Sequence, residues 1–263
     1  MNKQVGIVMI GAGNLATNLG KALYKEGFSI KQVFSRTEKS AKLLAQSIDA
    51  SYTTSFEDII PDQQLYIISL RDSAFLEHLP QIMKDKEGAL VVHTAGSVPL
   101  DLLKEYTTSC GVFYPMQTFS KHREVSFAEI PIFIEAEQPA DAQFLTSLAK
   151  QLSTKVYAAD SSQRTKLHLA AVFASNFSNH MFALSSKVLA KYGLPLDAMS
   201  SLISETCRKA QEVDPFKAQT GPAVRCDHEV MKNHLEMLSD LPELQDIYKQ
   251  ISNSIIKHKL DSE

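Results

Sequence analysis

The first 157 residues alternate short apolar runs with longer segments in which apolar residues recur at helical spacing. The short runs are rich in Val, Ile and Phe and are bounded by Gly, Pro or polar residues, which predicts buried strands. These strands are expected at residues 5–10, 30–35, 65–70, 89–93, 112–114, 131–135 and 155–157. The longer segments predict helices at residues 14–26, 38–47, 73–83, 100–106 and 140–152. Strands that alternate with helices predict an α/β domain with a parallel sheet covered on both faces.

The pattern changes after Asp160, where the strand signals end. Residues 161–192 contain neither Gly nor Pro, which predicts one long helix that ends at Gly193. Further helices are expected at residues 195–213, 227–241 and 242–259, with a loop at residues 214–224. The sequence therefore predicts an α/β domain over residues 1–157 and an all-α domain over residues 158–263.

The long predicted helix is unusually apolar. Within residues 167–189 the apolar side chains point in nearly every direction, which predicts a helix that is buried on most sides. One small helical domain does not readily cover so much apolar surface. We therefore expect a homodimer that forms through the helical domain.

A glycine-rich turn joins the first predicted strand to the first predicted helix. Gly11, Gly13 and Ala16 follow the pattern G-x-G-x-x-A. Gly11 permits a tight turn, Gly13 has no side chain that could block a pyrophosphate, and Ala16 lets the helix pack closely on the strand. The start of the helix offers amide donors and partial positive charge to phosphate oxygens. The turn predicts a Rossmann-type dinucleotide site whose first binding residues are Gly11, Ala12, Gly13, Asn14 and Leu15.

The end of the second predicted strand distinguishes between the two nicotinamide dinucleotides. A site that prefers NAD usually places Asp or Glu there, to bind the ribose 2′-hydroxyl. This chain instead has Ser35, Arg36 and Thr37, about 22 residues after Gly13 and without an acid. The Arg36 guanidinium can bind a 2′-phosphate and stack on adenine, while the two hydroxyls can donate hydrogen bonds. The sequence therefore predicts NADP as the cofactor.

The nicotinamide is expected beyond the carboxyl ends of the next two strands, where ligands of such sheets bind. Ser69, Leu70, Thr94 and Ala95 are expected to line its ribose mainly through their backbone, and Gly96 is expected to allow a close approach at the same cofactor site. His93 precedes this turn, and its imidazole could donate a proton or could be a structural group bonded to the loop. Both interpretations of His93 stay open at this point.

The long helix also carries a narrow polar stripe. His168, Ser175, Asn179 and Ser186 fall within about 40° of one another around the helix axis, and Asn176 flanks them. Buried polar groups need hydrogen-bond partners, so the stripe forms either an internal or dimer seam or one wall of a substrate cleft. In the second case His168 and Asn176 are the expected cleft residues.

A loop before one of the later helices carries a further candidate. Gly221 and Pro222 predict a turn, and Asp227 predicts the cap of the following helix. Arg225 is not explained by the turn, because its planar guanidinium is suited to binding a substrate carboxylate. Arg225 could instead pair with Asp227 or bridge a subunit interface.

These motifs resemble those of pyrroline-5-carboxylate reductase. The residues that carry the resemblance are Gly11–Ala16, Ser35-Arg36-Thr37, Ala95-Gly96 and the Gly193-Leu194 break after the long helix. The resemblance implies a Rossmann domain, a helical dimerisation domain and NADPH-dependent reduction of a C=N bond. The chain departs from the reductase at two stretches, Tyr114-Pro115-Met116-Gln117-Thr118 and Thr220-Gly221-Pro222-Ala223-Val224-Arg225.

Almost the whole chain is similar to a group of Rossmann-like NADP oxidoreductases that carry a C-terminal domain of unknown function. The motifs of that group stand here as Tyr114-Pro115-x-Gln117-Thr118-Phe119, as His168 to Asn176 and as Thr220-Gly221-Pro222-Ala223-x-Arg225-x-Asp227. The group commonly has His where this chain has Tyr114. The resemblance implies NADP and a two-domain architecture. Hydroxyacid dehydrogenases of the same superfamily place Lys four residues before the helix Asn, where this chain has Val172.

Composition excludes several other classes of protein. The 263 residues are 44% hydrophobic and 22% charged, with a formal net charge of -3, as in ordinary globular proteins. Neither half is basic, so we expect no nucleic-acid partner. Three widely spaced cysteines give no disulfide framework and no metal site, which favours a reducing compartment. Residues 5–10 are too short for a signal peptide and no run has the ~18 apolar residues of a membrane span, so we expect a cytoplasmic protein.

Together these observations predict an NADP-dependent oxidoreductase. Hydride would pass between NADP(H) and a small carbonyl or imine compound bound between the two domains, with the cofactor supplying the difficult chemistry. His93 or His168 would donate the proton, and Asn176 and Arg225 would position the substrate. The sequence shows no unambiguous Lys, Tyr or carboxylate acid, so an NADP-binding sensor or scaffold without turnover is the alternative.

Overall fold

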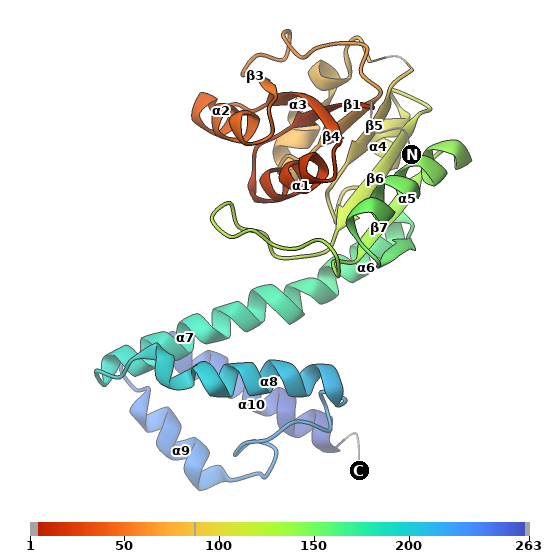
Figure 1. The fold of residues 1–263 in the computed structure, drawn as a ribbon. Helices are drawn as coiled ribbons and strands as arrows, with labels where there is room; N and C mark the ends of the chain where they lie inside the picture. Colours follow the sequence, from red (N-terminus) through yellow and green to blue (C-terminus); the bar gives the residue numbers. More distant parts are fainter. Residues whose placement is uncertain (1–4, 87, 261–263) are drawn as a thin grey trace. The chain divides into compact units, whose positions relative to one another are not determined.

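The computed structural model describes residues 5–86 and 88–260 (Figure 1). The chain divides into two compact units, one that ends at Asn176 and one that begins at Phe177. The division falls inside the long predicted helix, and the predicted domain boundary after residue 157 stays a prediction.

The first unit contains an eight-stranded sheet. Its strands are β1 (Gly6–Ile10), β2 (Ser29–Phe34), β3 (Ser51–Thr53), β4 (Leu65–Ile68), β5 (Leu90–His93), β6 (Cys110–Pro115), β7 (Ile132–Ala136) and β8 (Val156–Ala158). They are ordered β3-β2-β1-β4-β5-β6-β7-β8. Strand β3 was not predicted, because two of its three residues are exposed and form no apolar run.

The predicted Rossmann-type sheet is present, but one pair of strands differs from the prediction. All neighbouring strands are parallel except β6 and β7, which are antiparallel. Parallel neighbours need a crossover, usually a helix, whereas antiparallel neighbours can be joined by a loop. The connection from β6 to β7 contains no helix within the described chain, which accounts for the reversal.

Helices cover both faces of the sheet, as the alternation predicted. The helices are α1 (Asn14–Lys25), α2 (Glu38–Ser47), α3 (Asp72–Met83), α4 (Asp101–Lys104) and α5 (Pro139–Leu152) (Figure 1). Along β1, Ile7 and Met9 join a core cluster with α1, α2 and α5, whereas Val8 and Ile10 join a second cluster with α3 and α4. This alternation is that of a strand buried on both faces, and it anchors the start of α1 to the centre of the sheet.

The long predicted helix is present with an internal irregularity. It consists of α6 (Ser161–Ala171), the π-helical turn η1 (Val172–Phe177) and α7 (Ser178–Lys191). Asp160 starts α6 with a capping box, because its carboxylate accepts a hydrogen bond from the Gln163 amide at 2.7 Å and its own amide donates to Gln163 Oε1 at 3.0 Å. Gly193, with φ +67°, follows the end of α7 as predicted.

The second unit is helical. After a 3-10 turn, η2 (Leu196–Met199), it contains α8 (Ser200–Glu212), α9 (His228–Met237) and α10 (Pro242–Leu260). Asp227 caps α9 as predicted, accepting a hydrogen bond from the Val230 amide at 3.2 Å. In the described part of the chain, no helix combines the length and apolarity needed to cross a membrane.

The expectation that the long helix is buried on most sides is wrong for the single chain. Three of its apolar residues, Leu169, Phe173 and Phe177, are 59%, 62% and 48% exposed.

Candidate cofactor and catalytic site

The glycine turn has the geometry that phosphate binding requires. Gly11 has φ +119°, and a Cβ atom there would lie 2.2 Å from the carbonyl oxygen of Ser69, so a side chain is excluded. A Cβ atom on Gly13 would meet no described atom within 4 Å, so space is open above the turn. Gly13 is also the N-cap of α1 and has no side chain to bond the first amides of the helix. These amides are free to bond an external acceptor. They form the set of donors that a pyrophosphate needs.

A pocket of about 520 Å³ lies over this turn. Its lining residues come from the carboxyl ends of the central strands, the starts of α1, α2 and α3, and the β6–β7 loop. They are Gly11, Ala12, Gly13, Asn14, Leu15, Ser35, Arg36, Thr37, Ser40, Ser69, Leu70, Arg71, Asp72, Ala74, Thr94, Ala95 and Lys121. Of the residues predicted to bind the cofactor, all but Gly96 line this pocket, so the residues present fit a dinucleotide.

One end of the pocket is suited to an additional phosphate. Arg36 follows β2 and is exposed, and Thr37 is the N-cap of α2 without a side-chain hydrogen bond of its own. Within residues 5–86 and 88–260 no carboxylate forms an ion pair with Arg36. The guanidinium and the hydroxyls are therefore available to an anion.

The central part of the pocket is formed by the ends of β4 and β5. Thr94 Oγ1 donates a hydrogen bond to Ser69 Oγ at 3.1 Å, and the Thr94 amide donates to the Ile68 carbonyl at 3.0 Å. The Ser69 amide in turn donates to the Ile10 carbonyl at 2.7 Å. These bonds fix both strand ends against the glycine turn.

His93 is fully buried below this region and does not line the pocket. Its Nδ1 accepts a hydrogen bond from the Ala95 amide at 3.2 Å, so the neutral ring carries its hydrogen on Nε2. Within the described chain Nε2 has no partner. Burial, assisted by the positive charge of Arg164, lowers the pKa of His93 to about 3. The geometry therefore favours the structural alternative, in which neutral His93 supports the turn that follows β5.

Arg164 is a buried charge that the sequence analysis did not single out. Its side chain is 1% exposed, and its guanidinium bonds the Glu135 carboxylate in β7 and the Val98 carbonyl in the loop after β5. It also donates to Ser161 Oγ at 3.2 Å. Sequence offers no signal for this role, because one arginine in a polar first turn of a helix is normally solvated. Arg164 fixes α6 to the sheet and to the loop after β5.

One helical turn beyond Arg164, His168 lies beside Tyr114 and Gly96. The Tyr114 hydroxyl is 3.3 Å from His168 Nδ1. A Cβ atom on Gly96 would lie 2.8 Å from His168 Nδ1 and 3.0 Å from Tyr114 Cζ, so this approach requires glycine. Gly96 directly follows Ala95, which lines the cofactor pocket. The structure thus brings the predicted residues Gly96 and His168 together next to the predicted nicotinamide end.

Tyr114 is a further candidate that was not singled out from the sequence. Burial raises the pKa of Tyr114, an effect that the nearby Arg164 charge opposes. The hydroxyl therefore stays protonated at neutral pH and can act as a donor. The available signal was its position in the Tyr114-Pro115 motif, where the resembling group commonly has His.

The two predicted substrate-positioning residues belong to other parts of the chain. Asn176 lies in η1, at the end of the first unit, and is exposed. Arg225 belongs to the second unit, in the loop before α9, and is also exposed. Within the described ranges, no group of three His, Cys, Asp or Glu side chains is arranged to hold a metal ion.

The fold and the pocket define a Rossmann-type dinucleotide-binding protein with a helical C-terminal unit. Residues 5–96 match the family described as NADP oxidoreductase coenzyme F420-dependent, and residues 130–255 match a domain of unknown function, DUF2520. No protein with curated function matches the chain.

Several solved structures are similar to this chain over nearly its whole length. A Bacteroides fragilis protein, provisionally described as an NADP oxidoreductase, is 56% identical, with a TM-score of 0.95 over 97% of this chain and 99% of that one. An imine reductase from Myxococcus stipitatus, solved with NADP+, is 16% identical with a TM-score of 0.65 over 98% and 93%. A pyrroline-5-carboxylate reductase from Coxiella burnetii is 14% identical with a TM-score of 0.57 over 99% and 98%. The latter two share the fold with this chain.

The chain belongs to the family of NADP oxidoreductases in which a Rossmann domain precedes the domain DUF2520. The predictions of the family, of the fold class, of an oxidoreductase and of NADP as its cofactor class are confirmed. The roles of individual residues stay predictions.

Proposed function

We propose that this protein transfers hydride between NADP(H) and a small carbonyl or imine compound. The observation that carries the proposal is the single pocket in which the glycine turn, Arg36 and the ends of β4 and β5 come together. The cofactor supplies the hydride at its nicotinamide ring. The rest of the reaction depends on groups that this chain provides.

Each part of the pocket has a distinct role in this proposal. The backbone of residues 11–15 binds the pyrophosphate at the start of α1. Ser35, Arg36 and Thr37 bind the 2′-phosphate, which NAD lacks. Ser69, Leu70, Thr94 and Ala95 line the nicotinamide ribose, and Gly96 follows them outside the pocket, against His168. Gly13 supports this arrangement, because the open space above it admits a phosphate.

We assign the proton to the pair formed by Tyr114 and His168. Reduction of a C=O or C=N bond needs one proton on the oxygen or nitrogen, in addition to the hydride. The Tyr114 hydroxyl is protonated at neutral pH, and His168, 3.3 Å away, can return a proton to it after each reaction. The position of both side chains against Gly96 supports this role, and His93 keeps a structural one.

Asn176 and Arg225 stay in the proposal as substrate-positioning groups. The amide can bond a polar substrate, and the guanidinium can bind a carboxylate in a planar, bidentate manner. The imine reductase and the pyrroline-5-carboxylate reductase share the fold, which makes cyclic imines the first compounds to test.

We also propose that the protein is a homodimer formed through its helical part. The exposed apolar residues of the long helix, which follow one another at a spacing of four, support this, since contiguous apolar surface commonly marks an interaction site. In the second unit an apolar pocket of about 370 Å³ adds to the uncovered surface.

The test is a screen of carbonyl and imine compounds that follows NADPH absorbance, with Tyr114→Phe and His168→Ala as companions. We expect turnover of at least one compound class by the wild-type protein and a slower reaction in both variants, with NADP affinity unchanged. Tight NADP binding with no turnover of any compound would contradict the proposed hydride transfer and favour a cofactor-binding sensor.

A further inference from the structure

A second cation reaches the end of the cofactor pocket from a distant part of the chain. Lys121 lies in the loop between β6 and β7, yet it lines the pocket together with Arg36 and Ser40. Its Nζ donates a hydrogen bond to Ser40 Oγ at 3.3 Å, in the first turn of α2. Its backbone amide donates to Asn14 Oδ1 at 3.3 Å. Lys121 therefore bridges the starts of α1 and α2.

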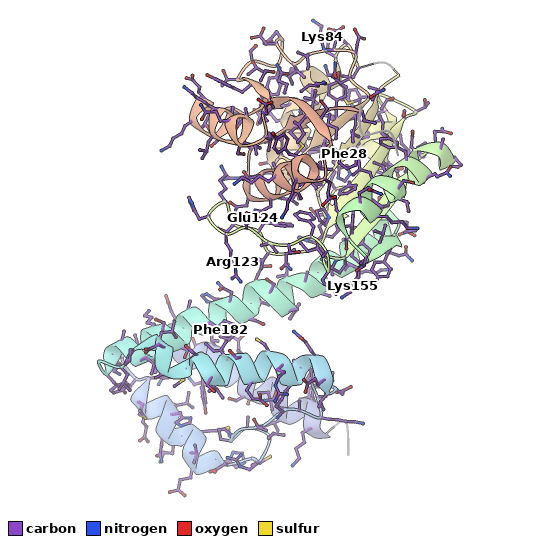
Figure 2. All side chains as sticks on the ribbon, viewed as in Figure 1. Phe28, Lys84, Arg123, Glu124, Lys155 and Phe182 are labelled. Carbon is purple, nitrogen blue, oxygen red and sulfur yellow. The ribbon has the colours of Figure 1, made fainter. Side chains whose placement is uncertain are left out.

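Two asparagines on α1 hold this loop in place. The side chain of Asn18, 6% exposed, donates to the Ser120 carbonyl at 3.0 Å and to the Asn14 carbonyl at 2.9 Å. Asn14 and Asn18 are one helical turn apart, so both face the loop. On the other side, Phe119 stacks on Phe127 with ring centroids 5.6 Å apart. The backbone that carries Lys121 is thus fixed on α1, whereas the loop residues Arg123 and Glu124, labelled in Figure 2, are exposed.

The charges around Lys121 favour an anion with two negative charges. Among the described residues no carboxylate pairs with Lys121 or Arg36, which gives this end of the pocket two uncompensated cations. Glu38, in the first turn of α2, accepts a hydrogen bond from the Tyr52 hydroxyl at 3.1 Å and does not line the pocket. Asp72 lines the pocket from the start of α3, where its carboxylate accepts a hydrogen bond from the Ser97 hydroxyl. A phosphate monoester carries close to two negative charges at neutral pH and accepts several hydrogen bonds.

We propose that Lys121 is the second cation of the 2′-phosphate site, so that the β6–β7 loop takes part in selecting NADP over NAD. The inference rests on the proposed use of NADP. The position of Nζ at Ser40, beside Arg36 and Thr37, favours the 2′-phosphate over the pyrophosphate, which binds at the start of α1. The sequence around β2 predicts the contact of Arg36 with the 2′-phosphate. Lys121 adds a second contact at the same place, because folding brings it there from a distant part of the chain.

Calorimetric titration with four ligands tests the assignment. The ligands are NADP and 2′,5′-ADP, which carry the 2′-phosphate, and NAD and ADP, which do not. We expect Lys121→Ala to weaken the first two about tenfold, the size of one charge-assisted hydrogen bond. NAD and ADP should change less than about twofold, because their pyrophosphate contacts stay intact. Lys121→Arg should keep most of the affinity, since it keeps the charge.

The matched control is Arg123→Ala, which removes one positive charge from an exposed position of the same loop outside the pocket. It should leave all four affinities unchanged, and circular dichroism and thermal unfolding verify that each variant folds. If Lys121→Ala weakens the binding of NADP and NAD equally, Lys121 contacts the pyrophosphate and the assignment to the 2′-phosphate is wrong. If it changes none of the four affinities, Lys121 contacts neither phosphate group and the assignment is also wrong. A wild-type protein that binds neither dinucleotide would instead refute the proposed function and the inference with it.

Discussion

The two units of the chain differ in how far each covers its own apolar residues. In the first unit the central strands β1, β4, β5 and β6 are buried along their whole length, and two core clusters fill both faces of the sheet. Within the described second unit the buried apolar residues are Ala223 and Leu244, while Leu202, Phe216 and Ile251 are 62%, 69% and 43% exposed. The first unit therefore has the core of an independent domain, whereas the second lacks much of the burial that stabilises one.

The same difference is visible in the polar groups. The first unit encloses a charged cluster around Arg164, and its cofactor pocket is fixed by hydrogen bonds between strand ends. The charged pairs of the second unit, such as Arg208 with Glu205, are on the surface. A site that must hold reacting groups within a fraction of an ångström needs the first kind of environment. Surface ion pairs and exposed apolar residues, as in the second unit, are suited to a surface that binds another protein chain.

The largest expected effect comes from removing the buried arginine. Arg164→Met leaves the Glu135 carboxylate and the Val98 carbonyl without their partner, and we expect it to lower the free energy of unfolding by about 3 kcal/mol. The matched control is Arg208→Met, which breaks exposed pairs with Glu205 and Glu212 and should cost less than about 0.5 kcal/mol. Urea unfolding of both variants measures the difference. Equal losses of unfolding free energy in the two variants would contradict the difference between the buried charge of the first unit and the exposed charge of the second.

Replacement of the Tyr114 hydroxyl tests the proton-transfer assignment. Tyr114→Phe keeps the ring that packs near Phe133 but cannot donate a proton, and we expect kcat to fall about a hundredfold. The Kd for NADP should be unchanged, because Tyr114 does not line the cofactor pocket. Stopped-flow measurement of single-turnover hydride transfer checks this, and an unchanged rate would remove the hydroxyl from the mechanism.

The buried histidine makes the stability of the first unit depend on pH. The pKa of His93 in the folded chain, about 3, is below its ordinary value of 6.5, so protons bind preferentially to the unfolded chain. This contribution to stability is fully present above pH 6.5 and is lost as the pH falls toward 3, by up to about 1.4 kcal/mol per pH unit. Urea unfolding between pH 7 and pH 5 should show the slope, and His93→Leu should reduce it. An identical slope in the variant would mean that other groups cause it.

Two leucines of matched exposure test the proposed dimer. Leu169, on the long helix, is 59% exposed, and Leu43, on α2 of the first unit, is 64% exposed. We expect Leu169→Glu to weaken association about a hundredfold, because it would bury a charge in the interface, and Leu43→Glu to have no effect. Light scattering at micromolar concentration distinguishes a dimer from the monomer of 29.2 kDa. A monomeric wild-type protein would contradict the proposal.

The parts of the molecule that sequence could predict are those encoded by neighbouring residues. The strand–turn–helix at Gly11 and Gly13, the acid-free end of β2 at Arg36 and the helix cap at Asp227 are local patterns, and the structure has each of them. The reversed strand β7 was not predicted, because strand direction depends on whether a helix crosses over. The π-helical turn η1 has no signal in the spacing of apolar residues.

The contacts that sequence could not predict join residues far apart in the chain. Tyr114 meets His168 across 54 positions, and Lys121 reaches Ser40 across 81. Arg164 bonds a carbonyl 66 positions away, and nothing in its local surroundings signals burial. Such contacts depend on which strands are neighbours in the sheet, and no single segment of the sequence predicts the strand order.

The central claim is that this pocket binds NADP, and the most direct test compares NADP with NAD. Calorimetric titration of the wild-type protein should show NADP bound at least about tenfold more tightly, because the 2′-phosphate gains charge-assisted contacts with Arg36. In Arg36→Ala the affinity for NADP should fall toward the affinity for NAD, and the affinity for NAD should stay unchanged. Equal affinity for NADP and NAD in the wild-type protein would contradict the account.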